Sequence, residues 1–353
     1  MHLATESWYG LRMDDRKQLL AKRALQELRT LRRRVAQLES AHRQPVAVVA
    51  TACRLPGAAD SPERYFDALA AGADAIGEVP PERWNADELY DPDPGVPGKI
   101  STRWGGFVDD VAAFDAGLFR VTDEEAASMD PQHRILLETT WQALERAGIS
   151  PTGLARASVG VFVGVMGDDY YQRLCRELGP ERMTSSAMTG NGHSILAGRL
   201  AYTLGLQGPA LALETACSSS LVAVHLACQS LRSHECETAL AAGVHLILDP
   251  TLHLLLTRTR TFSSSGRCLT FDARADGMVS SEGCGVLVLR RLDDALAQGD
   301  PILAVIRGSA VNHDGPSSGL TAPNGAAQRA VVRRALADAG LELDEVDVLE
   351  AHG

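Results

Sequence analysis

The chain has 353 residues, of which 45% are hydrophobic and 22% are charged, a composition typical of folded globular proteins rather than disordered, fibrous or membrane proteins. The formal net charge of −11 disfavours a nucleic-acid-binding surface that covers the whole molecule. The seven cysteines occur singly, without a CxxC pair, which argues against a disulfide framework or a zinc site and favours the reducing cytoplasm. Every apolar run is shorter than the roughly 20 residues that span a bilayer, so we expect no membrane segment.

The N-terminal segment predicts a long helix. Residues 14–43 lack glycine and proline, and Pro45 ends the helical pattern. Residues 12–43 carry a charge balance of +6, so the rest of the chain carries −17. The apolar side chains have the 3-4 spacing of a coiled-coil seam: Ala21, Ala24, Leu28, Leu31, Val35 and Leu38. We expect this seam to meet a partner chain and its basic face to suit an acidic partner, while packing on its own globular domain is the alternative.

From Pro45 onward, apolar strand-like runs alternate with helical segments. The predicted strands cover 46–53, 158–166, 209–214, 238–248, 283–290, 302–311 and 346–350, and the predicted helices cover 134–147, 217–232 and 325–340. This alternation indicates a right-handed, largely parallel, layered α/β fold. Residues 72–106 are rich in Pro, Asp and Gly, and we expect a long surface excursion there.

The segment from Leu211 to His225 is the most informative for chemistry. A buried strand stops, small residues allow a sharp turn, and Cys217 is expected in the first turn of the next helix. A helix N-terminus stabilises a thiolate, because its free backbone N–H groups and its dipole both favour negative charge. The same N–H groups supply half of an oxyanion hole. Cys217 is therefore the candidate nucleophile, although a cysteine at such a turn is also a common small buried side chain.

A histidine at the end of the chain is the second candidate. The predicted strand 346–350 leads directly to His352, which places an imidazole just beyond a strand end, where open α/β sheets hold active-site groups. By contrast, we expect His225 to pack within its helix. Five further histidines have no carboxylate at helical spacing: His133, His193, His245, His253 and His313.

These motifs resemble those of β-ketoacyl synthase domains in modular type I polyketide synthases. Residues 214–228, which include Cys217, resemble the nucleophile motif, and Glu350-Ala-His352-Gly resembles the start of the first histidine motif. The likeness extends through further motifs in the same order, at 54–57, 103–107, 129–138, 197–209, 266–272 and 319–325. The basic helix at 14–43 resembles the N-terminal docking helix that receives the upstream synthase subunit.

The resemblance implies a thiolase-like layered α/β/α/β/α fold, with the first half complete, the second half partial, and a helix before both. The implied domains are a docking or coiled-coil helix over 1–44, the ketosynthase N-terminal half with the nucleophilic cysteine over 45–295, and a partial C-terminal half over 296–353. The implied partners are an acyl carrier protein, the upstream subunit and a second copy of the chain in a homodimer. Neither nucleic acid nor membrane is expected as a partner.

The resemblance also implies a reaction. Cys217 would accept an acyl group from the phosphopantetheine arm of the carrier protein, so substrates are carried on that arm and no cofactor or metal is bound directly. Thioester is exchanged for thioester at little free-energy cost. Decarboxylation of a malonyl-type extender would then supply the carbanion that attacks this thioester. His352 matches the first of two histidines that stabilise the developing enolate oxygen.

The sequence departs from the family pattern at several points. Glu214 replaces the usual aspartate, Ser265 replaces another aspartate, and Ser280-Ser281 before Glu282 replaces Arg-Gly, which could loosen a local ion pair. The motifs that normally follow His352 are not in the sequence. We therefore expect a chain truncated within its second half that does not complete condensation, with self-acylation at Cys217 as a weaker alternative.

Three other interpretations assign the chain to different classes of protein. In the first, the chain is a docking or interaction fragment in which only the N-terminal helix is functional. A thiolase or a dissociated fatty-acid synthase condensing enzyme is disfavoured by the Ser-Ser-Ser after Cys217 and by the leading basic helix. A loading-type domain that only decarboxylates is disfavoured because such domains have glutamine at the position of Cys217.

Overall fold

A computed structural model gives the fold and describes residues 13–352, so Gly353 and the first twelve residues of the predicted docking domain lie outside the described residues. The described residues fall into two compact units, within Met1–Gln44 and Pro45–Gly353. Between residues 13 and 352, no helix combines the length and the apolar character needed to cross a bilayer.

The first unit is the helix α1, Met13–His42, which forms over the predicted range. Its apolar side chains are more than half exposed at five positions: Leu20, Leu25, Leu28, Leu31 and Val35. The side chain of Leu38, the last member of the predicted seam, lies outside those that the structure describes. The described part of the seam is therefore an exposed apolar stripe on α1.

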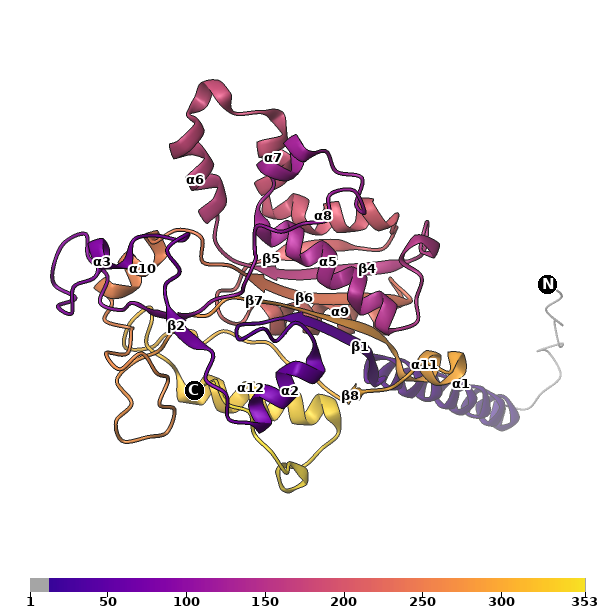
Figure 1. Ribbon diagram of the computed structural model, residues 1–353. Coiled ribbons are helices and arrows are strands. Elements are labelled where there is room, and N and C mark those ends of the chain that lie inside the picture. The colour runs from indigo at the N-terminus through magenta and orange to yellow at the C-terminus, as the bar shows by residue number, and fades with distance from the viewer. Residues whose placement is uncertain (1–12, 353) are drawn as a thin grey trace. The chain divides into compact units, whose positions relative to one another are not determined.

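The second unit is built on a six-stranded sheet with the order β5-β4-β6-β7-β1-β8 (Figure 1). Its strands are β1 Val46–Arg54, β4 Val159–Val165, β5 Ala210–Leu213, β6 Thr238–His245, β7 Gly283–Arg291 and β8 Ala304–Ile306. β4 is parallel to β5 and β6, whereas β7 is antiparallel to β6 and β1, and β1 is antiparallel to β8. The prediction of a largely parallel sheet is wrong, because residues 246–282 return the chain to the sheet at the end where β6 leaves it.

Helices cover both faces of this sheet. The helices of the unit are α2 Pro62–Ala70, α3 Ala86–Leu89, α4 Asp123–Ser128, α5 Pro131–Arg146, α6 Asp169–Leu178, α7 Ser185–Asn191, α8 His193–Leu204, α9 Ser219–Arg232, α10 Thr251–Arg258, α11 Leu292–Gln298 and α12 Gly325–Ala339, with single 3-10 turns at Pro151–Gly153, Pro180–Arg182 and Leu343–Glu345. α5 and α8 pack on one face, and α9 packs on the other. Figure 1 shows α6 and α7 on the same side of the sheet as α8, farther from the strands.

The core has two main parts because each central strand is buried on both sides. In β1, Ala47 and Val49 face the cluster that includes α5 and α8, whereas Val46 and Val48 face the cluster that includes α9. Every residue of β4 is buried, which agrees with its nearly continuous apolar sequence. Each cluster therefore ties its helices to the sheet by apolar burial, at about 25 cal/mol per Å² removed from water.

Residues 72–106 are not only a surface excursion. They contain a two-stranded antiparallel sheet of β2, Ile76–Glu78, and β3, Trp104–Gly106. Trp84 and Ile100 are buried with Ile247 in a third apolar cluster. Their apolar side chains, scattered among Pro, Asp and Gly, carry no helical or strand periodicity, and so the pattern gave no sign of this small core.

The segments predicted for the second half form only in part. Of the strand predicted over 302–311, only β8 forms, and it pairs with β1 of the first sheet. The strand predicted over 346–350 does not form, and the side chains of Val348 and Leu349 are 82% and 79% exposed. A strand needs a neighbour for its backbone hydrogen bonds, and none of the described residues pairs with this segment.

α12 forms over the predicted range because both of its ends carry capping residues. The side chain of Asn324 accepts hydrogen bonds from the N–H groups of Ala326 and Ala327, and Gly340 closes the helix in the left-handed conformation. α5 is started in the same way by Asp130, which accepts from the N–H of Gln132, followed by Pro131 at the first helical position.

Candidate active site

Cys217 lies in a sharp turn between β5 and α9. β5 ends at Leu213, α9 begins at Ser219, and Ser218 is the N-cap residue. Cys217 therefore lies just before the helix. The prediction that it lies in the first turn of the helix is wrong. Its thiol is free and exposed, whereas Cys228, further along α9, is buried. The alternative of a small buried side chain does not apply to Cys217.

Hydroxyl groups on both sides of Cys217 hold the turn closed. The Ser219 hydroxyl donates to the carbonyl oxygen of Ala216 at 2.7 Å and accepts from the N–H of Thr215 at 2.8 Å. The Ser218 hydroxyl donates to the Thr215 carbonyl oxygen at 2.8 Å. Ala216 has a φ of +54°, in the left-handed region that costs an alanine roughly 1–2 kcal/mol. The serines after Cys217 thus fix the backbone that presents the thiol.

Two glycines of the sheet allow α9 to begin against the strands. A Cβ atom on Gly164 of β4 would lie 2.6 Å from the carbonyl carbon of Ser219 and 2.7 Å from the nitrogen of Ser220. A Cβ atom on Gly243 of β6 would lie 2.7 Å from the Cβ of Ser220. These distances are too short for a real Cβ atom, so the close contact of α9 with the two strands requires glycine at both positions. We call this contact the seat of α9, and it fixes the distance of the Cys217 turn from the sheet.

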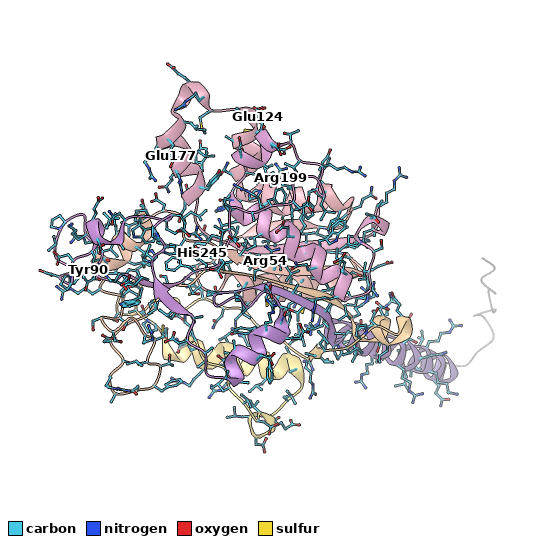
Figure 2. All side chains as sticks on the ribbon, in the orientation of Figure 1. Arg54, Tyr90, Glu124, Glu177, Arg199 and His245 are labelled. Atoms are coloured by element: carbon cyan, nitrogen blue, oxygen red, sulfur yellow. The ribbon has the colours of Figure 1, made fainter. Side chains whose placement is uncertain are left out.

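A cavity of about 1040 Å³ includes Glu214 in its lining, three positions before Cys217. Its walls come from α6, α7, the start of α8 and α10, and it includes Glu214 at the end of β5. Figure 2 marks α6 by Glu177 and α8 by Arg199. Much of the lining is apolar and flexible, through Met166, Met183, Met188, Leu252 and Leu255. The size and the lining fit a largely apolar small-molecule chain.

The charged side chains of the cavity are acidic. Asp168, Asp169 and Glu214 line it, together with His193, whose Nε2 lies 2.8 Å from the carbonyl oxygen of Gly167. Burial raises the pKa of Asp169, and the N–H groups of Leu248 and Asp249, which donate to its Oδ2, oppose that rise. Glu214 has no hydrogen bond or ion pair with any residue that the structure describes.

His352, the second predicted catalytic residue, is exposed and follows a segment without regular structure. No hydrogen bond joins it to Cys217 or to another described residue. The prediction that a strand end presents this imidazole fails here, since the strand 346–350 does not form. The structure thus positions Cys217 but does not bring His352 to it.

The other histidines serve different purposes. His225 is partly buried on α9, its Nδ1 lies 2.8 Å from the hydroxyl of Ser309, and burial lowers its pKa. His133 is buried, which lowers its pKa to about 3, and His253 stacks on Phe262 with a pKa lowered by burial to about 4. These groups are neutral near pH 7 and act as packed side chains, as expected for His225.

Sequence reasoning missed the cavity. In the sequence, Glu214 stands out only as a departure from a family motif, and the side chains opposite it come from segments about 20 to 50 residues away in either direction. The only local signal was the position of Glu214 at a strand end, three residues before the nucleophile candidate. Across residues 13–352, no group of three His, Cys, Asp or Glu side chains could hold a metal ion.

Comparison with family models places most of the chain in one family. Residues 43–295 match the model described as the β-ketoacyl synthase N-terminal domain, and residues 303–353 match the β-ketoacyl synthase C-terminal domain. Together the two matches include Cys217 and His352. The first match alone covers well over half of the chain.

Curated relatives are components of polyketide synthases. The chain is 53% identical to a component of the phenolphthiocerol/phthiocerol polyketide synthase of Mycobacterium tuberculosis. The match spans 310 residues, which are 88% of this chain and 20% of that protein. Over 311 residues it is 51% identical to the polyketide synthase GfsB of Streptomyces halstedii, of which it covers 6%. The chain therefore spans a fifth or less of the length of these relatives.

Solved structures with the same fold are ketosynthase domains. An oxazolomycin ketosynthase domain of Streptomyces albus matches with a TM-score of 0.83 and 41% identity, over 88% of this chain and 53% of that one. The ketosynthase from module 6 of the bacillaene synthase of Bacillus subtilis matches with a TM-score of 0.75 and 37% identity, over 84% of this chain and 49% of that one. These matches confirm the predicted thiolase-like fold. The chain belongs to the β-ketoacyl synthase family and is similar to the ketosynthase domains of polyketide synthases.

Proposed function

We propose that Cys217 is the residue that accepts the acyl group. The observation that carries this proposal is an exposed free thiol in a turn locked by the hydroxyls of Ser218 and Ser219, at the start of α9 and three residues from the cavity. In this step the Cys217 thiolate attacks the thioester carbonyl of an acyl group carried on phosphopantetheine. A new carbon–sulfur bond forms, the bond to the phosphopantetheine sulfur breaks, and that sulfur leaves as a thiolate that takes up a proton.

The second step, which belongs to the full-length domain, is decarboxylative condensation. A malonyl-type extender on a carrier protein loses carbon dioxide, and the resulting carbanion attacks the acyl carbonyl on Cys217. The carbon–sulfur bond to Cys217 breaks, which regenerates its thiolate. We assign to His352 the stabilisation of the enolate oxygen of the extender. A hydrogen-bond donor aimed at developing negative charge supplies a large share of the lowering of an activation barrier.

The partners follow from the proposed chemistry and from two exposed features. Acyl carrier proteins supply both thioesters. The apolar stripe and basic side chains of α1 fit an upstream subunit with an acidic helical segment. The free edge of β5 fits a second copy of the chain, since an edge strand has unpaired backbone groups. On this proposal, residues 1–44 dock, 45–295 form the half with the nucleophile, and 296–353 belong to the other half.

Intact-mass spectrometry after incubation with an uncharged acyl thioester tests the nucleophile. We expect the wild-type chain to gain one acyl group and Cys217→Ala to gain none. Cys268 is the matched control, because it is also exposed but lies outside the turn, so Cys268→Ala should be labelled like the wild type. Equal labelling of wild type and Cys217→Ala would reject the proposal.

A further inference from the structure

The cavity beside the Cys217 turn has a marked imbalance of charge. Three carboxylates line it, those of Asp168, Asp169 and Glu214. Among the described residues that form its walls, none is a lysine or an arginine. The remaining wall is mostly apolar, so little inside the cavity compensates the negative charge of these groups.

Two arginines on the helices around the cavity are engaged with other carboxylates, while Arg258 of α10 donates to backbone carbonyl oxygens of residues 94–96. Arg176 of α6 forms an ion pair with Asp249, and Arg199 of α8 forms one with Glu125 at 2.7 Å. Neither guanidinium is therefore available to bind an anion in the cavity without breaking its present pair. An anionic ligand would meet carboxylates without a matching cation among the lining residues. Asp168 and Glu214 are exposed, so solvent screens this repulsion but does not cancel it.

Glu214 is the carboxylate closest in sequence to the nucleophile. Three residues of chain span at most about 11 Å, and the turn at Ala216 shortens that path. Asp168 accepts a hydrogen bond from Gln172 at 2.6 Å, and Asp169 accepts two from backbone N–H groups, whereas Glu214 has no such partner among residues 13–352. Its charge is thus the least neutralised of the three by hydrogen bonding.

We propose that this cavity admits uncharged acyl chains to Cys217 and rejects chains that end in a carboxylate, with Glu214 as the specificity-determining residue. This inference rests on the proposed function, in which the two thioester substrates differ by one carboxylate. The acyl group that Cys217 accepts is uncharged, whereas the malonyl-type extender is an anion. Repulsion from Glu214 keeps the malonyl-type extender from reacting with the Cys217 thiol. The site therefore discriminates by an unfavourable contact with the wrong substrate.

Three acyl thioesters of N-acetylcysteamine with chains of similar length test the inference. They are hexanoyl, adipoyl with a terminal carboxylate, and trimethylammonio-hexanoyl with a terminal cation. The rate of Cys217 acylation is followed by intact mass at near-neutral pH, and each rate is divided by the rate of the same thioester with mercaptoethanol to remove differences in intrinsic reactivity. For the wild type we expect the adipoyl rate to fall about ten-fold below the hexanoyl rate, and the cationic chain to react at least as fast as hexanoyl.

Substitutions at Glu214 separate charge from shape. Glu214→Gln should raise the adipoyl-to-hexanoyl ratio about five-fold, because one negative charge is removed at nearly constant size. Glu214→Asp retains the charge and should keep the wild-type ratio. Glu82→Gln is the control, since Glu82 is an exposed carboxylate that does not line the cavity.

Two results would overturn the inference while leaving Cys217 as nucleophile: equal normalised rates for the three thioesters in the wild type, or an unchanged ratio in Glu214→Gln. The wild-type comparison needs no substitution, so it decides the matter even if Glu214→Gln does not fold. Failure of all three thioesters to acylate Cys217 would instead contradict the proposed function itself.

Discussion

Glu282 is a single residue that holds three distant segments together. Its side chain has no exposed surface, it accepts hydrogen bonds from the N–H groups of Val108 and Ile247 at 2.8 Å each, and it forms an ion pair with Arg83 at 3.2 Å. The serines before it, where an arginine is usual in the family, do not leave the carboxylate without a cation. Arg83, from the segment predicted to be only a surface excursion, supplies it.

We predict that Glu282→Gln destabilises the fold by about 3 kcal/mol, because the substitution leaves the largely buried Arg83 guanidinium without its counter-charge. Thermal and urea unfolding followed by circular dichroism would measure the loss. Glu82→Gln removes an exposed carboxylate one position from Arg83 and should change stability by less than about 0.5 kcal/mol. Unfolding transitions that coincide for wild type and Glu282→Gln would contradict the role given to this ion pair.

The sequence predicted Cys217 but not its surroundings. A thiol among small residues at a strand-to-helix junction has a local pattern, and so Cys217 could be chosen as the candidate nucleophile from nearby residues alone. The glycines that seat α9 lie 55 residues before and 24 residues after Ser219, and nothing local relates Gly164 or Gly243 to the turn. The hydrogen bonds of Ser218 and Ser219 are short in sequence range, yet their direction depends on the left-handed conformation of Ala216.

At the scale of elements, some capped helices and some strands with continuous apolar runs were predicted within a few residues, whereas the capped helices α2 and α4 were not. α12 and β4 are examples, because their periods and end residues are local properties. The relative direction of β6 and β7 was not predictable in this way, since it depends on how residues 246–282 cross the end of the sheet. The strand expected over 346–350 has the right composition but no neighbouring strand among the described residues.

The contact between α9 and the sheet provides a prediction for this scale. Gly164→Ala should push the start of α9 away from β4 and slow acylation of Cys217 about ten- to hundred-fold, because displacement of a reacting group by about 1 Å has effects of this size. Overpacking of the contact should also cost about 1–3 kcal/mol of stability. Single-turnover acylation followed by mass spectrometry measures the rate.

Gly285→Ala is the matched control for this prediction. Gly285 lies in β7 of the same sheet, but a Cβ atom there would meet no heavy atom within 4 Å. The control should acylate at the wild-type rate, with circular dichroism used to verify that both variants are folded. If Gly164→Ala acylates as fast as Gly285→Ala, the seat does not control the position of Cys217.

At the scale of the whole molecule, the free edge of β5 is the feature that bears on assembly. β5 is the last strand at one side of the sheet, and Leu211 within it is 45% exposed. We predict that the chain sediments as a dimer and that Leu211→Lys raises the dissociation constant at least about ten-fold, because a lysine charge on an edge strand blocks edge pairing. Sedimentation velocity over a range of concentrations measures this constant.

A leucine on another surface serves as the control for the dimer prediction. Leu296 of α11 is 62% exposed and lies outside the strands, so Leu296→Lys should leave the dissociation constant unchanged. A wild-type chain that remains monomeric at every concentration would contradict the prediction. So would equal weakening by Leu211→Lys and Leu296→Lys, which would point to a general effect of added charge.

The position of β1 inside the sheet has a consequence for the order of folding. β1 is the first strand among residues 13–352, yet its partners in β7 lie 230 to 245 residues later, from Arg54↔Cys284 to Val46↔Arg291. At a synthesis rate of roughly 5–20 residues per second, this apolar strand waits on the order of ten seconds or more before its neighbour leaves the ribosome. Pairs so distant in sequence also close slowly in the free chain, since the entropy of the loop is lost before any contact forms. During that interval the sequence Val-Ala-Val-Val-Ala is an unpaired β-prone segment, so we expect β1 to be a site of chaperone binding on the nascent chain.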